Sequence, residues 1–178
     1  DALRTRLEIE EGDLVLFAAD KWDVACEVLG RLRLRSAEIL KVIPGHEVIG
    51  KVVALGSNAK GLKVGQRVGV GWGSGSCMHC SQCQNGESNL CAQNVPTIVG
   101  HFGGFADRVR AQWPWAVPIL DGLDPANAGP LLCGGVTVYA PLRRFGVGAG
   151  SRVAVVGIGG LGHIALMMLK AMGAETTA

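Results

Sequence analysis

The sequence predicts a β-rich domain, followed by the first βα unit of an α/β domain and preceded by a βα segment of different character. Three observations lead to this fold class. The chain has 27 glycines but only 5% aromatic residues, which favours a turn-rich β or α/β protein over a helical bundle. Short β-branched runs between glycine turns predict a small barrel or sandwich. A glycine-rich turn near the end stands between an apolar strand and an apolar helix, which is the order of a βα unit.

Length and charge limit the possible partners. The 178 residues suffice for one large domain or two small ones. With a net charge of +2 and 18% charged residues, nothing favours nucleic acid or a membrane as a partner. The start of the chain lacks an apolar leader pattern, and the apolar stretch 153–169 contains glycines and a histidine that suit a strand, a turn and a helix. We therefore expect a cytoplasmic protein.

Residues 1–41 differ in pattern from the rest of the chain. An apolar run at 14–18 predicts a buried strand. Residues 21–40 carry apolar side chains at helical spacing and predict a helix, on which Cys26 fits a small core residue.

The next part of the chain predicts two short strands. Residues 43–56 begin with a Pro-Gly turn and continue through His46 and Glu47 into β-branched residues at strand spacing. Residues 61–70 repeat the order of turn and strand. A His-Glu pair beside a strand is by itself weak support for a functional site.

Four of the six cysteines form a C-x2-C-x2-C-x7-C array: Cys77, Cys80, Cys83 and Cys91. Thiols at this spacing converge on one tetrahedral ion, and Zn(II) favours such a closed thiolate cage. A disulfide knot or a redox pair is the alternative, but disulfides between such close cysteines would be strained, and nothing else marks a secreted chain. Since four thiols fill the shell, we expect His79 to be a solvated loop residue. The array predicts a structural zinc.

The C-terminal part predicts a dinucleotide-binding turn. Residues 152–156 form an apolar strand pattern, and an apolar helix follows the turn up to about residue 173. Glycines let the backbone approach a pyrophosphate, whose charge is met by amides at the helix N-terminus. We assign cofactor binding to Gly157, Gly159, Gly160, Leu161 and Gly162. A strand–helix packing turn without a cofactor is the alternative, and a second strand is expected near residues 175–178.

From residue 42 onward, the motifs resemble those of zinc-dependent medium-chain alcohol dehydrogenases of the cinnamyl-alcohol-dehydrogenase and bacterial aldehyde-reductase branch. The segments that carry the resemblance are GHEVIGKVVALG, KVGQRVGVGW, the four-cysteine array, PTIVGHFGGFADRV, AGPLLCGGVTVYAPL and VVGIGGLGHIALMMLKAMGA. The resemblance implies a GroES-like barrel over residues 42–150, a structural zinc lobe over 77–91, a linking helix over 130–144 and the start of a Rossmann NAD(P)-binding domain over 151–178.

The resemblance also implies a catalytic zinc site. The GHE motif supplies a zinc ligand that maps onto His46, with Glu47 as a neighbouring acid that lies near the metal or exchanges onto it. The PLLCGG motif supplies a second ligand, Cys133, and Thr137 matches a position lining the nicotinamide. Zinc with an open position lowers the pKa of a bound alcohol, so that hydride passes to the nicotinamide, and the reverse reaction reduces an aldehyde. The implied cofactors are one structural and one catalytic zinc and NADP(H) in preference to NAD(H).

The chain departs from the family pattern upstream of residue 42. The family's first zinc ligand is a cysteine in a GICHSD-like motif, which also carries the groups that relay the alcohol proton. Residues 1–41 contain no such motif, and the flanks of Cys26 differ, so we do not assign it as a ligand. These residues instead resemble a segment of bacterial aspartyl-tRNA synthetase, EEGDLVLFAADKWDVACEVLGRLRLR, without the active-site motifs of that enzyme.

We therefore expect a fragment with two of the three family zinc ligands, a truncated Rossmann domain, and little or no activity by itself. Family members act on small-molecule alcohols or aldehydes and are usually homodimers through the nucleotide domain, an interface that this chain would lack. The alternative hypothesis is a non-catalytic, zinc-stabilised structural or binding module in a chimeric chain.

Overall fold

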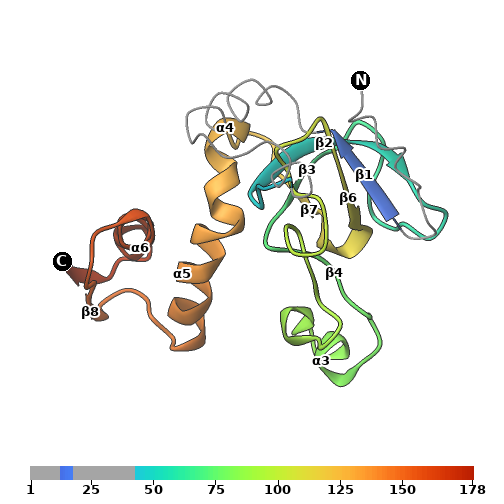
Figure 1. The fold of residues 1–178 in the computed structure, drawn as a ribbon. Coiled ribbons are helices and arrows are strands. Elements are labelled where there is room, and N and C mark those ends of the chain that lie inside the picture. Colours follow the sequence, from blue (N-terminus) through green and yellow to red (C-terminus); the bar gives the residue numbers. More distant parts are fainter. Residues whose placement is uncertain (1–12, 18–42) are drawn as a thin grey trace, which may run out of the picture.

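A five-stranded antiparallel sheet is the centre of the fold. The structure, a computed structural model, describes residues 13–17 and 43–178. The strands lie in the order β6–β1–β2–β3–β7 (Figure 1). Their bounds are β1 Asp13–Phe17, β2 Val48–Leu55, β3 Arg67–Val70, β6 Arg108–Gln112 and β7 Val117–Pro118. The predicted β-rich domain is confirmed.

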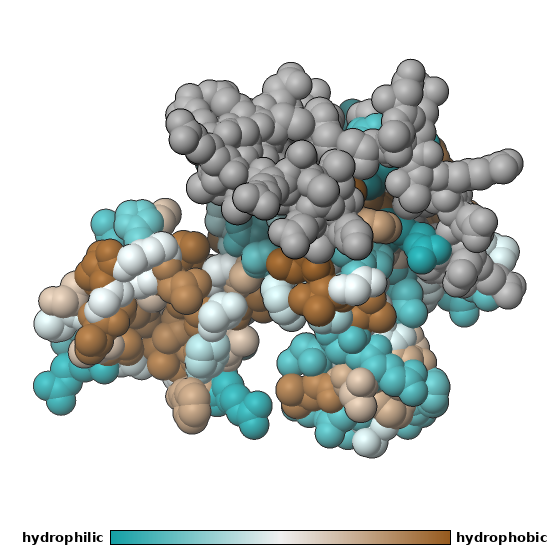
Figure 2. All heavy atoms as spheres, viewed as in Figure 1, coloured by the Kyte–Doolittle hydropathy of each residue, from teal (hydrophilic) through white to brown (hydrophobic). Residues whose placement is uncertain are grey.

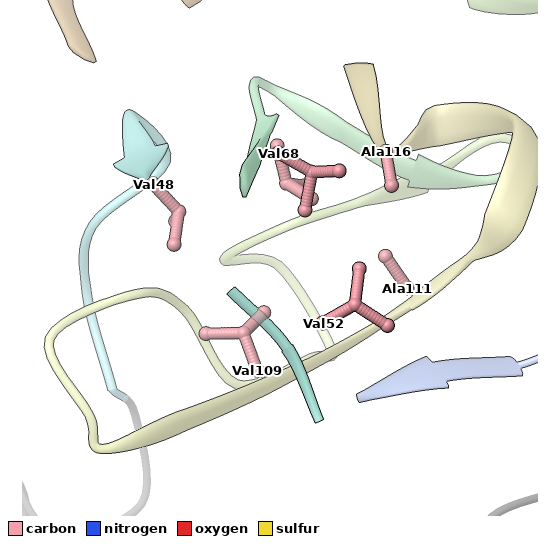
Figure 3. Close-up of a cluster of buried hydrophobic side chains, with 7 residues drawn as sticks. Val48, Val52, Val68, Val109, Ala111 and Ala116 are labelled. Carbon is pink, nitrogen blue, oxygen red and sulfur yellow. The ribbon is translucent and has the colours of Figure 1, made fainter. Parts of the chain in front are cut away.

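Valine side chains form the core beside this sheet. In β2, buried residues alternate with more exposed ones, because successive side chains of a strand point to opposite faces. Val68 of β3 is completely buried, and Val52 of β2 is 1% exposed. Burying one such side chain stabilises the fold by about 1.5–3 kcal/mol. The cluster in Figure 3 comprises Val48, Val52, Val68, Val70, Val109, Ala111 and Ala116.

Strand β1 brings part of the N-terminal segment into the sheet. It lies where the apolar run predicted a strand, displaced by one residue, and it pairs with both β2 and β6. Leu14 stands opposite Leu55 on one side and Ala111 on the other. The pairing with β2 shifts register between Val15 and Leu16. The helix predicted over 21–40, with Cys26, lies outside the described residues.

The four-cysteine segment forms a separate lobe below the sheet in Figure 1. Its neck is a two-stranded antiparallel pair, β4 Gly73–Gly75 and β5 Val95–Pro96. Between these strands lie the short helix α3 Ser81–Gln84 and the 3-10 turn η1 Ser88–Leu90. The chain returns from the lobe to β6, and the 3-10 turn η2 Trp113–Trp115 joins β6 to β7.

The linking helix begins later than the sequence predicts. We expected one helix over 130–144, but the chain forms α4 Pro125–Ala128, the 3-10 turn η3 Gly129–Leu132 and then α5 Gly134–Arg144. Cys133 interrupts the run with φ −128° and ψ −73°. Pro130, which stands at the start of η3, lacks the N–H that a longer preceding helix would need. Cys133 therefore occupies a break in the helix.

The C-terminal residues form a β8–α6–β9 unit. Strand β8 covers Arg152–Ala154, helix α6 covers Gly160–Ala171, and β9 covers Glu175–Thr177. The predicted strand is shorter than expected, and the expected second strand is present and pairs in parallel with β8. The helix packs on the start of α5, where a Cβ on Gly134 would lie 3.1 Å from Ile164 Cδ1.

Hydrophobic surface is concentrated at the α6 end of the molecule, whereas the four-cysteine lobe is mainly hydrophilic (Figure 2). Exposed apolar side chains at the α6 end include Val156, Ile158, Leu161 and Met167, and Val156 is 98% exposed. None of the helices in the described part of the chain combines the length and hydropathy that crossing a bilayer requires.

Replacing Val68 by alanine is expected to lower the free energy of unfolding by about 2 kcal/mol, because two buried carbons are lost and a small cavity remains. Val64→Ala is the matched control, since Val64 is 64% exposed, and it should change the free energy by less than about 0.5 kcal/mol. Urea unfolding of both variants measures the difference. Equal effects at the two positions would contradict the assignment of Val68 to the core.

Candidate metal centres and nucleotide-binding turn

The four sulfurs of the lobe have the spacing of a tetrahedral zinc site. The Sγ atoms of Cys77, Cys80, Cys83 and Cys91 all lie within 4.8 Å of one another. Three of the separations are 3.6 Å for Cys91–Cys77, 3.8 Å for Cys80–Cys91 and 3.9 Å for Cys77–Cys83. Sulfurs bound to one tetrahedral Zn(II) stand ~3.8 Å apart. The residues therefore fit a closed four-thiolate site.

Backbone and hydroxyl groups surround these sulfurs. The N–H of Cys80 donates to Cys77 Sγ at 3.3 Å, and the N–H of Gln93 donates to Cys91 Sγ at 3.3 Å. The Cys83 thiol donates to the Ser76 hydroxyl oxygen at 3.5 Å. The two backbone donors stabilise thiolates, which are the form that binds zinc.

Two thiols of the lobe differ widely in pKa. The backbone N–H groups of His79 and Cys80 lower the pKa of Cys77 from its ordinary 9.0 to about 6. At Cys80, the backbone N–H of Cys83 lowers the pKa, but desolvation and the neighbouring thiols outweigh it and raise the pKa to about 11. Cys77 is thus a thiolate at neutral pH, whereas Cys80 gives up its proton when the metal binds.

His79 stands outside the ligand set, as the sequence predicts. Its ring is exposed, and its Nδ1 lies 2.6 Å from the carbonyl oxygen of Cys77. Among the described residues, the group of potential ligands in the lobe consists of the four cysteines alone.

A second group of potential ligands lies beside the sheet. His46, Glu47 and Cys133 place a ring nitrogen, a carboxylate oxygen and a sulfur within 4.8 Å of one another. His46 Nε2 lies 3.2 Å from Cys133 Sγ, although the two residues are 87 positions apart. A nitrogen and a sulfur bound to one tetrahedral zinc stand ~3.6 Å apart. The two groups would therefore have to move only slightly further apart to bind the metal.

His46 is held by a turn that packs against the segment 103–105. Gly45 has φ +97°, a left-handed conformation that side chains disfavour, and it directs the chain into β2. The carbonyls of Ile43, Pro44 and Gly45 accept one backbone N–H each from segment 103–105, at 2.7, 2.9 and 2.7 Å. The Trp72 ring meets the His46 ring edge-on, with centroids 5.2 Å apart.

Cys133 is held by the contact of η3 with the end of β3. A Cβ on Gly71 would overlap the carbonyl oxygen of Leu132, so only glycine permits this approach. Burial raises the pKa of the Cys133 thiol, and the charge of Glu47 raises it further. A metal bound to this sulfur would therefore have to displace the thiol proton.

Thr137 lies one helical turn after Cys133. Its backbone N–H donates to the Cys133 carbonyl at 2.9 Å, and its side chain is exposed. Side chains four positions apart lie on the same face of a helix, so Thr137 shares the face of α5 that begins at Cys133.

The glycine turn joins β8 to α6 closely. A Cβ on Gly162 would overlap the carbonyl oxygen of Gly157, and the buried Gly162 therefore permits the helix to start against the strand. A Cβ on Gly159 or Gly160 would meet nothing within 4 Å, so the outer side of the turn is open. Leu161 is 51% exposed. The turn thus leaves the N-terminus of α6 uncovered on its outer side.

Comparison with known proteins identifies the family. The model for the alcohol dehydrogenase GroES-like domain matches residues 20–121, more than half of the chain. The chain belongs to the alcohol dehydrogenase GroES-like family. The match begins within residues 1–41, while the resemblance of those residues to aspartyl-tRNA synthetase stays a prediction.

Similar proteins are dehydrogenases and reductases. The chain is 51% identical over 137 residues to aldehyde reductase AdhA of Synechocystis sp., covering 77% of this chain and 41% of the relative. It is 45% identical over 145 residues to NADP-dependent alcohol dehydrogenase 6 of Saccharomyces cerevisiae, covering 77% of this chain and 40% of the relative. The chain thus spans about two-fifths of the length of these curated relatives.

A solved structure shares the fold over nearly the whole chain. The cinnamyl alcohol dehydrogenase, CAD, of Helicobacter pylori in complex with NADP(H) superposes with a TM-score of 0.79 at 28% identity. The alignment covers 95% of this chain and 51% of that one.

Two features beside the family site were missed at the sequence level. Trp72 contacts His46, and segment 103–105 supports the turn before it, yet neither carries a metal-ligand side chain. The adjacent glycines Gly103 and Gly104 were the available signal, because paired glycines mark close backbone approaches.

In the metal-free lobe, iodoacetamide at pH 7 is expected to modify Cys77 well before Cys80. A pKa of about 6 leaves Cys77 mostly as the reactive thiolate at that pH, whereas a pKa of about 11 keeps Cys80 protonated. Peptide mass spectrometry over time measures the order. At pH 5 the Cys77 rate should fall, and an unchanged rate there would contradict the lowered pKa.

Proposed function

We propose that the chain carries the zinc-binding part of an oxidoreductase that transfers hydride between NADP(H) and an alcohol or aldehyde. The observation that carries the proposal is the meeting of His46 and Cys133, whose Nε2 and Sγ atoms lie 3.2 Å apart. Membership of the alcohol dehydrogenase GroES-like family supports the same chemistry, as do the names of the relatives, an aldehyde reductase and an alcohol dehydrogenase.

In this proposal the second ligand group holds a catalytic zinc. His46 and Cys133 are the two ligands that the sequence implies, and Glu47 brings a carboxylate oxygen into the same group. One nitrogen, one oxygen and one sulfur make three protein ligands, which is the number in catalytic zinc sites that keep a position open. When bound, the zinc would act as a Lewis acid on the substrate oxygen.

The protein side chains around this group have separate roles in the proposal. Trp72 fixes the orientation of the His46 ring through its edge-on contact. Glu47 is exposed, so its carboxylate is free to move toward the metal or toward water. Thr137, one turn further along α5, would contact the nicotinamide. The four-cysteine lobe would hold a structural zinc with no open position.

The β8–α6–β9 unit supports the nucleotide part of the proposal. Parallel sheets in α/β domains are covered on both faces. The exposed apolar side chains at the α6 end are consistent with a surface that further elements of such a domain would cover. The glycine turn would receive the pyrophosphate at the N-terminus of α6. The preference for NADP(H) over NAD(H) is supported by the yeast relative named as NADP-dependent and by the Helicobacter structure in complex with NADP(H).

Zinc content tests the proposal. After loosely bound metal is removed, elemental analysis of the purified 178-residue chain should find two zinc ions per chain. Cys83→Ser should remove the lobe zinc, and His46→Ala or Cys133→Ser should each remove the other. His79→Ala is the control and should retain both, because its ring lies outside the ligand sets.

A single zinc in the unmodified chain, retained in both His46→Ala and Cys133→Ser, would contradict the catalytic site. That result would leave the zinc-stabilised structural or binding module as the function of this chain. A chain without zinc would contradict both metal sites.

Turnover by these 178 residues alone is expected to be undetectable. Residues 151–178 supply two parallel strands and one helix, whereas a dinucleotide lies across the crevice of a larger sheet. The loss of NADPH absorbance in the presence of an aldehyde measures this. Turnover that His46→Ala abolishes would contradict the expectation of inactivity and would establish the reductase chemistry directly.

A further inference from the structure

Thr97 lies where the zinc lobe rejoins the sheet. It follows β5, the returning strand of the neck, and it is completely buried. Its hydroxyl donates to the carbonyl oxygen of Gly71 at 2.7 Å, and its backbone N–H donates to the carbonyl oxygen of Trp72 at 2.7 Å. One residue thus fixes two consecutive carbonyls at the exit of β3.

The two residues that Thr97 fixes contact one proposed zinc ligand and the residue next to the other. Gly71 packs on the backbone of Leu132, the residue immediately before Cys133. The Trp72 ring meets the His46 ring edge-on, at an interplanar angle of 86°. Both contacts depend on the position of segment 71–72, because in each case that segment supplies one of the two contacting groups.

We propose that Thr97 is a positioning residue for the catalytic metal site, holding the segment 71–72 so that His46 and Cys133 face one another. The proposal rests on the proposed function for the identity of that site. Without the hydroxyl, the Gly71 carbonyl loses its buried donor, and the segment gains freedom to shift. Both ligands then lose the surface that fixes their separation.

The test compares Thr97→Val, which keeps the shape but removes the donor, with Thr97→Ser, which restores it. Ser74→Ala is the matched control. Ser74 is also buried, and its hydroxyl also donates to a carbonyl in the neck, that of Val95 at 3.1 Å. That bond does not involve Gly71 or Trp72, so the control removes a similar hydrogen bond without releasing the segment.

The first readout is the affinity for Co(II) of the full 178-residue chain, with zinc retained in the lobe. The visible bands of cobalt distinguish a mixed nitrogen, oxygen and sulfur site from a four-thiolate one. Thr97→Val should bind cobalt about tenfold more weakly than the unmodified chain, as expected when a group that orients a metal ligand is lost. Thr97→Ser and Ser74→Ala should stay within about twofold of the unmodified chain.

The second readout needs no metal at the catalytic group. Iodoacetamide modification of Cys133, followed by peptide mass spectrometry, reports how freely its thiol leaves the contact with His46. Thr97→Val should raise this rate about fivefold, since the local structure opens more often, and Thr97→Ser should restore the slow rate.

The outcomes separate this inference from the proposed function. If the unmodified chain binds no cobalt outside the lobe, the proposed catalytic site is wrong, and the modification rate alone decides whether Thr97 positions Cys133. If both readouts for Thr97→Val equal those of the unmodified chain, the inference is overturned. It is also overturned if Thr97→Val loses the lobe zinc, because Thr97 would then support the neck as a whole.

Discussion

The second ligand group depends on the close contact between η3 and the exit of β3. Strands β2 and β3 pair antiparallel with Val48 opposite Val70, so the start of β2 lies beside the end of β3. His46 precedes β2 by two residues, and Gly71 follows β3 directly. Because Gly71 carries no side chain, the backbone of Leu132 rests on it, and Cys133 arrives opposite His46. A larger residue at this position would move one ligand away from the other.

The two groups of potential metal ligands differ in what must fold before they form. The lobe ligands lie within a short stretch of chain, so little loop entropy is lost when their sulfurs converge. The second group joins residues 87 positions apart and exists only once the sheet has formed and η3 has docked on it. The lobe is therefore a largely local structure, and the second group is a product of the whole domain. Thr97 connects the two, since it leaves the lobe neck and binds the exit of β3.

Strand β1 gives the N-terminal segment a place in the domain. It lies between β2 and β6, so its backbone groups complete the hydrogen bonding of two strands that carry core valines. The family match also begins before residue 41. Residues 1–41 differ from the rest of the chain in sequence pattern, but residue 41 is not a boundary of the sheet, because β1 belongs to it. The pairing of β1 with β2 and β6 needs only backbone N–H and C=O groups, which nearly every residue supplies.

The sequence by itself determined the features that depend on local spacing. These are the grouping of the four lobe cysteines, the glycine turn before α6 and the alternation of buried residues in β2. The meeting of His46 with Cys133 was implied only by family resemblance, since no spacing rule relates residues so far apart. Tertiary structure alone decided the break at Cys133, the contact of Trp72 with His46 and the double hydrogen bond of Thr97. Each of these depends on which segments pack together, and long-range packing leaves no periodic signal in the chain.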